Sequence, residues 1–195
     1  MDRRHFIAAA GAVATAFAAE PVWAKVAAPN ADKALLALLD AMFNDGIARS
    51  PEFATSLGLD KGRLAPLRAQ LSPATAAERH KDLARARNWQ SKLKAIRTAS
   101  LSETGQRYKA RVEYMLGQRT LSAGKYDIDS VQTPYRLYQQ GGAYFGIPDF
   151  LNSAHPINTA ADCEAYLSRV ASFALRLDED TAGQRIEAAR GLIAP

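Results

Sequence analysis

Residues 158–191 read NTAADCEAYLSRVASFALRLDEDTAGQRIEAARG, and this stretch decides the fold class. Thr159 and Asp162 form a T-x-x-D start that resembles a capping box, in which each side chain binds the other residue's backbone N–H. Gly191 is a typical residue for ending a helix. Between these signals the apolar residues keep helical spacing; they are Cys163, Tyr166, Leu167, Val170, Phe173, Ala174 and Leu177. The pattern predicts one long helix that runs to Arg190.

The first part of the mature chain also reads as helix. Asn30 can cap a first helix, because its side chain can accept a hydrogen bond from the first turn. The apolar residues that follow recur at spacings of three and four; they are Leu35, Leu38, Leu39, Met42, Phe43 and Ile47. Ser50-Pro51 ends this helix and opens a short one that Gly58 can terminate.

Two more helices are predicted in the middle of the chain. Ser72-Pro73 marks a start, because a capping residue precedes Pro at the first helical position, and this helix reaches about Ile96. Ser102 with Glu103 in the first turn starts the other. The apolar stripe of that helix consists of Tyr108, Val112, Met115 and Leu116. No period-two alternation of useful length occurs, so the sequence predicts an all-α fold of four or five helices packed as a helical bundle.

Residues 1–24 have the features of an export signal. Arg3-Arg4 precedes an apolar run that ends near Ala19, and Ala24 closes a small-residue cleavage site. This order is typical of a signal peptide, and the paired arginines favour the twin-arginine type over an ordinary secretory signal. The run is shorter than the roughly 20 residues that cross a bilayer. We therefore expect a periplasmic or secreted helical domain over residues 25–195, with no membrane span.

Cys163 is the only cysteine, so the chain can form no internal disulfide. Because Cys163 lies on the apolar stripe of the last predicted helix, we expect a buried structural thiol.

Charge is unevenly distributed along the chain. Residues 61–97 carry ten Lys and Arg against two acids, whereas residues 149–190 carry seven acids against four Arg. The basic segment has only Trp89 to stack on bases, and an exported protein rarely meets nucleic acid, so we do not expect a nucleic-acid partner. We interpret it as a solvated face that can dock against an acidic surface of the same protein.

No familiar catalytic constellation is present. The histidines are His5, His80 and His155, and no two of them have the one-turn spacing of a helical zinc site. The G-x-S-x-G elbow, the P-loop and the G-x-G-x-x-G fingerprint are all missing. The sequence therefore predicts no catalytic residue, no metal ligand and no cofactor in this chain.

Residues 134–157, PYRLYQQGGAYFGIPDFLNSAHPI, differ in composition from the helices around them. Pro134, Pro148 and Pro156 prevent one continuous helix, and paired glycines permit tight turns. Aromatic rings and polar side chains are concentrated here. Irregular segments of this kind held by rigid helices are common binding sites. A packed corner between helices, with tyrosine hydroxyls satisfied locally, explains the composition equally well.

Three blocks in order carry a resemblance to a known family: ARSPEFATSLGLDKG (residues 48–62), the segment 134–157, and the helix that starts NTAADCEAYLSRV. Together, behind an export signal, they resemble the N-terminal part of the bacterial family known as domain of unknown function 885. The positions matched in the second block are Gln139, Gly142, Pro148, Phe150, Leu151, His155 and Ile157.

The resemblance implies a larger all-helical fold similar to gluzincin-type zinc metallopeptidases. In such enzymes an H-E-x-x-H helix would hold zinc and supply the base. That helix belongs to the later part of the family pattern, so this chain is expected to be incomplete at its C-terminus and inactive alone. Its partners would be the missing C-terminal portion and a peptide substrate. The resemblance implies that Tyr138, Gln139, Tyr144 and His155 line the wall of the substrate channel. The alternative is a self-sufficient periplasmic binding module for a peptide or an anionic ligand.

Overall fold

The computed structural model of the protein describes residues 30–128, 130–132 and 134–194. Within these ranges every regular element is a helix, so the all-α prediction is confirmed. The signal-peptide prediction for residues 1–24 lies outside the described residues. Among the helices that are described, none has both the length and the apolar character needed to cross a membrane.

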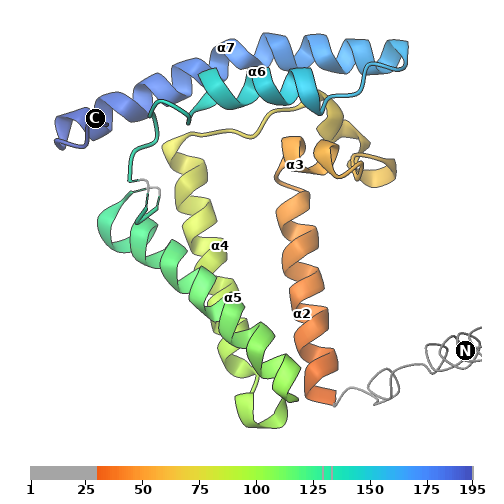
Figure 1. Cartoon of the computed structure of the whole chain (residues 1–195), viewed down its shortest axis with the longest axis vertical. Helices are drawn as coiled ribbons and strands as arrows, with labels where there is room; N and C mark the ends of the chain where they lie inside the picture. The colour runs from red at the N-terminus through yellow and green to blue at the C-terminus, as the bar shows by residue number, and fades with distance from the viewer. Residues whose placement is uncertain (1–29, 129, 133, 195) are drawn as a thin grey trace, which may run out of the picture.

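The helices follow one another along the chain with short connections. They are α2 (Asn30–Ile47), α3 (Pro51–Ser56), the 3₁₀ helix η2 (Gly62–Ala69), α4 (Ala76–Ala95), the 3₁₀ turn η3 (Thr98–Ser100), α5 (Glu103–Leu121), the π turn η4 (Ser122–Tyr126), α6 (Ala143–Ser153) and α7 (Ala160–Ala189). α4 and α5 form an antiparallel hairpin beside α2, and α6 and α7 lie together across one end of these helices (Figure 1).

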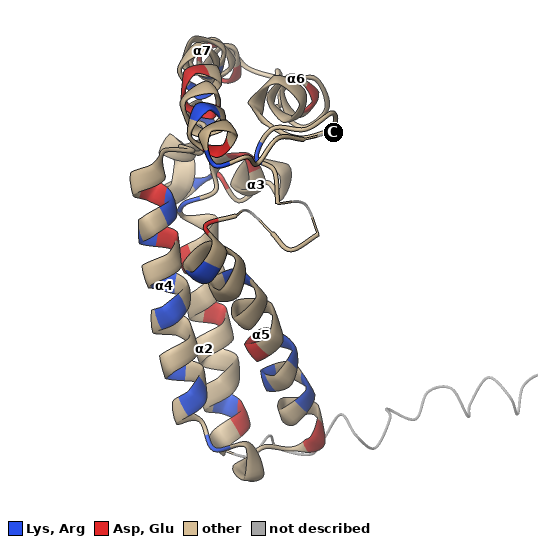
Figure 2. Cartoon of the chain, turned by 90° about the vertical axis from the view of Figure 1, so that its left-hand side faces the viewer, with Lys and Arg blue, Asp and Glu red and all other residues tan. Residues whose placement is uncertain are grey.

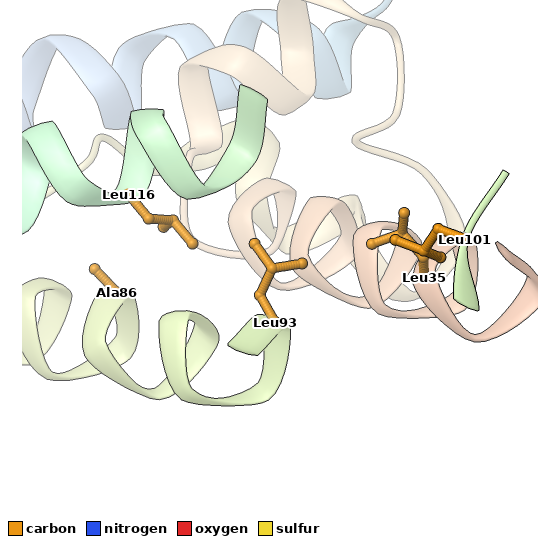
Figure 3. Packing of buried hydrophobic residues seen from close by; sticks show 5 residues of the cluster. All are labelled: Leu35, Ala86, Leu93, Leu101 and Leu116. Carbon is orange, nitrogen blue, oxygen red and sulfur yellow. The ribbon is translucent and has the colours of Figure 1, made fainter. Parts of the chain in front are cut away.

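Two separate hydrophobic clusters hold the helices together. Figure 3 shows the larger cluster, in which side chains of α2, α4 and α5 meet around Leu35 and Leu93, both fully buried. Its buried members are Leu35, Ala86, Leu93, Leu101 and Leu116. The smaller cluster packs Ala143, Ile147 and Leu151 of α6 against Phe173 and other side chains. The two clusters share no residue, although Leu71, from the segment between η2 and α4, packs against the smaller one.

The predicted ends of α7 are confirmed. Thr159 Oγ1 accepts a hydrogen bond from Asp162 N at 3.2 Å, and Asp162 Oδ2 accepts one from Thr159 N at 3.0 Å. These reciprocal bonds are the capping box. Gly191 follows the helix with φ of +79°, a conformation that glycine adopts without strain.

The predicted start of α4 is wrong. Ser72 does not cap the helix, because its backbone N–H donates to Glu52 at 2.9 Å and its hydroxyl also bonds that carboxylate. Thr75 is the cap instead, and its Oγ1 accepts from Glu78 N at 3.1 Å. A long-range tie to Glu52 therefore keeps residues 70–75 out of the helix.

Pro148 lies inside α6 rather than at a helix boundary. The ring removes one backbone donor and normally weakens a helix interior. In α6 the loss is offset by the burial of Ile147, which precedes Pro148, and of Leu151, which follows it; each is only 6% exposed.

The predicted inward face of α7 is confirmed only in part, since Tyr166 and Phe173 pack against the smaller cluster but other members of the stripe do not. Leu167 and Val170 are 59% and 43% exposed, and Cys163 is exposed, so the expectation of a buried thiol is overturned. The residues that α7 buries are Asp162, Ala165, Arg169, Gly183 and Glu187. α7 turns this side inward because its polar groups bind backbone atoms and side chains of the segments beneath it.

Most of the ion pairs that the basic segment 61–97 forms are with acids of the same segment. Blue bands of Lys and Arg run along α4 in Figure 2. Arg85 pairs with Glu78 of the same helix at 2.6 Å. Arg68 reaches the acidic segment, where it pairs with Asp162 at 2.7 Å. Among the described residues, the Arg68–Asp162 ion pair is thus the one ion pair that joins the basic segment 61–97 to the acidic segment 149–190.

Candidate functional site

The segment before α6 makes a tight turn that only glycine permits. Tyr138 and Gly141 form an isolated antiparallel bridge, with Gly141 N donating to Tyr138 O at 3.0 Å. A Cβ on Gly141 would lie 2.1 Å from the Tyr138 ring, so the ring covers the glycine backbone directly. Gly142 has φ of +110° and starts α6. The paired glycines therefore fold the chain back onto an aromatic ring.

Tyr144 closes this turn from the first residues of α6. Its hydroxyl lies 2.7 Å from the Tyr138 carbonyl oxygen and 2.8 Å from that of Gln139. Tyr144 is 46% exposed, and Gln139 is exposed as well. The structure thus brings together Tyr138, Gln139 and Tyr144 through these two backbone contacts, and Gln139 is exposed to solvent.

His155 lies apart from this group, at the other end of α6, and is only 7% exposed. Its Nδ1 is 2.6 Å from Arg169 Nη1, and its Nε2 is 3.0 Å from the Asp162 carbonyl oxygen. A guanidinium can only donate, so Nδ1 accepts and the proton is on Nε2, which donates to Asp162. Both ring nitrogens are therefore used within the fold.

Arg169 is the centre of a buried polar network. Its Nε donates to the Gln70 carbonyl oxygen at 2.8 Å, and its Nη2 donates to Thr55 Oγ1 at 2.8 Å and to the Leu67 carbonyl oxygen at 3.0 Å. The guanidinium also lies over the Phe150 ring at 4.8 Å. Arg169 therefore ties the segment from α3 to residue 70 to the middle of α7.

Burial lowers the pKa of Arg169 from its ordinary value, because desolvation disfavours the charged form. The carboxylates of Glu52 and Asp60 act in the opposite direction. The hydrogen bonds leave no donor nitrogen of Arg169 without an acceptor. The network is therefore a fully satisfied structural unit, which the charge needs in order to stay buried.

Asp60 and Asp162 flank Arg68 next to this network. Arg68 Nε is 3.1 Å from Asp60, and its Nη1 is 2.7 Å from Asp162. Burial alone would raise the pKa of Asp60, but the hydrogen bonds from Arg68 and Thr55 outweigh it and hold the pKa below its ordinary value. Asp60 is therefore ionised in the folded protein at neutral pH.

The sequence reasoning missed this polar face of α7, although the sequence contains a signal for it. Asp162, Arg169 and Arg176 recur every seven residues, and Gly183 continues the series. Residues at this spacing share one side of a helix. The apolar series lies next to this side of the helix, and it dominates the pattern because burial of apolar residues is the commoner case.

A zinc site is not formed within the described residues. No three His, Cys, Asp or Glu side chains in the part of the chain that the structure describes gather closely enough to hold a metal ion. His80 lies exposed on α4, whereas His155 is buried beside α7. The resemblance assigns the zinc-binding H-E-x-x-H helix to a later part of the family pattern, so it implies no zinc ligand among these residues.

The comparison with family models gives a match over residues 51–195, to the model described as bacterial protein of unknown function (DUF885). No curated protein and no solved structure matches the chain. The family match covers α3 to α7 and includes both the aromatic turn and the Arg169 network. The chain belongs to the DUF885 family of bacterial proteins.

Proposed function

We propose that this chain forms part of the substrate-channel wall of an exported zinc-dependent peptidase and supplies no catalytic group of its own. Membership of the DUF885 family supports the proposal; the peptidase activity itself rests on the resemblance described in the sequence analysis. In this proposal the described helices are an N-terminal wall. The zinc-binding helix comes from a later part of a longer family protein.

The observation that carries the proposal is the exposed apolar face of α7. Leu167, Val170 and Leu177 are 59%, 43% and 36% exposed, and their spacings of three and seven put them on one stripe. A helix normally turns such a stripe toward a packing partner. A further helical layer against α7 would cover this stripe, as expected of a wall within a larger all-helical enzyme.

The aromatic turn is the proposed contact with peptide. Gln139 has an exposed amide that can both donate to and accept from a peptide backbone. The rings of Tyr138 and Tyr144 offer apolar surface beside it. His155 has no free ring nitrogen, so in this proposal it acts on the channel indirectly by holding Arg169 in place.

Zinc itself is assigned to none of the described residues. A helical zinc peptidase needs three protein ligands and an open position for water. Since the donors here do not converge, no step of hydrolysis is attributed to them.

The test uses a longer DUF885 protein that carries an H-E-x-x-H motif. At the positions that match Gln139 and Tyr144, alanine should raise KM for a peptide substrate about 3- to 10-fold, because contacts to the peptide are lost. Zinc content, measured by atomic absorption, should not change. Alanine at the position that matches Arg111, an exposed residue of α5, is the control.

Unchanged kcat and KM in both channel variants would contradict the peptide-contact role. Zinc-dependent hydrolysis by the present chain alone would contradict the claim that it supplies no catalytic group.

A further inference from the structure

Two cavities meet between α4, α7 and the segment that leads into α6. The larger has a volume of about 320 Å³ and the smaller about 240 Å³. Arg79 and Arg136 line both cavities, and Arg176 lines the smaller one. We call this region the arginine cleft, defined by Arg79, Arg136 and Arg176, which come from three different segments.

Arg79 brings a charge that no described carboxylate neutralises. Its Nη1 donates to the Ala74 carbonyl oxygen at 2.7 Å, and it takes part in none of the ion pairs formed among the described residues. The side chain is half-buried on the first turns of α4. A partly desolvated guanidinium of this kind attracts an anion more strongly than an exposed one does.

Arg136 and Arg176 each direct a buried nitrogen that has no acceptor among the described residues. These atoms are Nη1 of Arg136 and Nε of Arg176. The other groups of Arg136 are engaged, since Nε and the backbone N–H both bond Glu187. Buried N–H groups are rarely left without a partner, so the hydrogen-bonding capacity of these two guanidinium groups is not fully used within the described residues.

The acids of the smaller cavity are held by other groups. Glu179 accepts from Ala74 N at 2.7 Å, just before α4, and Asp180 accepts from Ala143 N at 2.6 Å, at the first residue of α6. Arg176 lies between the two carboxylates, at 3.0 Å from Glu179 and 3.4 Å from Asp180. Because both acids bind helix starts, neither is paired with Arg79.

Glycines line the smaller cavity on the side of α6 and α7. A Cβ on Gly142 would lie 2.5 Å from Leu137 Cδ2 and 3.4 Å from Asp180 Oδ2. Gly183 faces the Arg136 side chain, and a Cβ there would be 3.8 Å from Cδ. A larger residue at Gly142 would therefore displace Leu137, and one at Gly183 would contact the Arg136 side chain.

We infer that the arginine cleft is a binding site for a small oxyanion, a carboxylate or a phosphate group. Such a group has several acceptor oxygens and can take charge-assisted hydrogen bonds from more than one guanidinium. It would neutralise Arg79 and add acceptor oxygens beside the incompletely satisfied guanidinium groups of Arg136 and Arg176. The inference does not depend on the peptidase proposal, because it uses none of the side chains of Tyr138, Gln139 and Tyr144 that the proposal assigns to peptide contact.

The test titrates the whole chain with phosphate and, separately, with succinate, at an ionic strength held constant with sodium chloride. Calorimetry should give saturable binding for at least one of the two anions, and the melting temperature should rise with that anion. Arg79→Gln should weaken binding by at least about tenfold, because a charge-assisted bond is lost. Arg111→Gln, on an exposed residue outside the cleft, should bind as the unmodified chain does.

A second variant keeps the inference testable if Arg79→Gln does not fold. Ala76→Asp places a carboxylate at the first residue of α4, where negative charge stabilises a helix, and Ala76 lines the larger cavity. It should keep or raise the melting temperature while it competes with the added anion. Binding to phosphate alone or to succinate alone assigns the chemical class. Binding to neither anion, or equal affinity in Arg79→Gln and the unmodified chain, overturns the inference.

Discussion

Arg169 is fully buried, and each of its three guanidinium nitrogens lies within hydrogen-bond distance of an acceptor on another segment. His155 is one of these acceptors, and its tautomer is fixed by the same contact. A buried charge is tolerated only with such partners, and removal of one member leaves the others unpaired. At the scale of single residues, stability therefore depends on polar groups as much as on the apolar clusters.

Arg169→Met should lower the free energy of unfolding by about 3–5 kcal/mol, because it strands buried acceptors on α3 and η2. Urea unfolding followed by circular dichroism measures the loss. Arg185→Met, on an exposed residue of the same helix, is the matched control and should change stability by less than about 0.5 kcal/mol. Equal stability of the two variants would show that the network contributes nothing.

The lowered pKa of Asp60 predicts how the free energy of unfolding changes at acidic pH. Its pKa is lowered in the folded protein, so its contribution is fully present above the unfolded pKa of about 4 and is lost as pH falls below that value. The free energy of unfolding should therefore decrease as pH falls below about 4, and Asp60→Asn should reduce this decrease. Urea titrations at several pH values measure the slope.

Asp60→Asn should also be less stable at neutral pH, because Arg68 loses a partner. Glu103→Gln is the control, since Glu103 is highly exposed and pairs only with Arg107 on the surface. If Asp60→Asn kept the full acid slope, the lowered pKa of Asp60 would not be its cause.

At the scale of helices, α5 is fixed to α2 through its first turn. Ser102 Oγ accepts from Gly105 N at 3.1 Å, and the Ser102 N–H donates to Asp32 of α2 at 2.9 Å. A Cβ on Gly105 would lie 2.5 Å from Asp32 Oδ1. The glycine is therefore required by the close approach of the two helices, not by its backbone angles.

Alanine should have opposite effects at the two glycines of α5. Gly105→Ala should destabilise the protein by about 1–3 kcal/mol, because the methyl group displaces the Asp32 carboxylate. Gly117→Ala meets nothing within 4 Å and should stabilise by up to about 1 kcal/mol through helix propensity. Thermal melts of both variants give the comparison, and a stabilising Gly105→Ala would contradict the close packing.

The helices themselves were predictable because their signals are local. Caps at Ser102 and Thr159 and the break at Gly191 lie within one turn of the ends that they specify. The start of α4 was not predictable, since Glu52 binds Ser72 from twenty residues away. The prediction of the inward face of α7 was incomplete for the same reason, because the buried polar groups of α7 bind segments that are distant in sequence.

The candidate site was predictable only in part. The composition of residues 134–157 indicated the aromatic turn, and the structure brings Tyr138, Gln139 and Tyr144 together there. His155 could not be placed from sequence, because its burial depends on Arg169, fourteen residues away. The arginine cleft was not predicted at all, since its members come from three segments that local patterns do not connect.

At the scale of the whole molecule, the helices form two groups, each around its own apolar cluster. Figure 1 shows α6 and α7 lying across the end of the other helices rather than among them. Polar contacts join the groups, including the Arg68–Asp162 ion pair and the bond from Ala74 to Glu179. The molecule therefore has no single apolar centre among its described residues.

This separation leaves a boundary between the two groups of helices. Ion pairs at a partly exposed boundary weaken as salt is added, whereas apolar packing does not. The Arg68–Asp162 pair is therefore the contact between the groups that added salt should weaken, whereas the buried hydrogen bonds of Arg169 to Thr55 and Leu67 should hold.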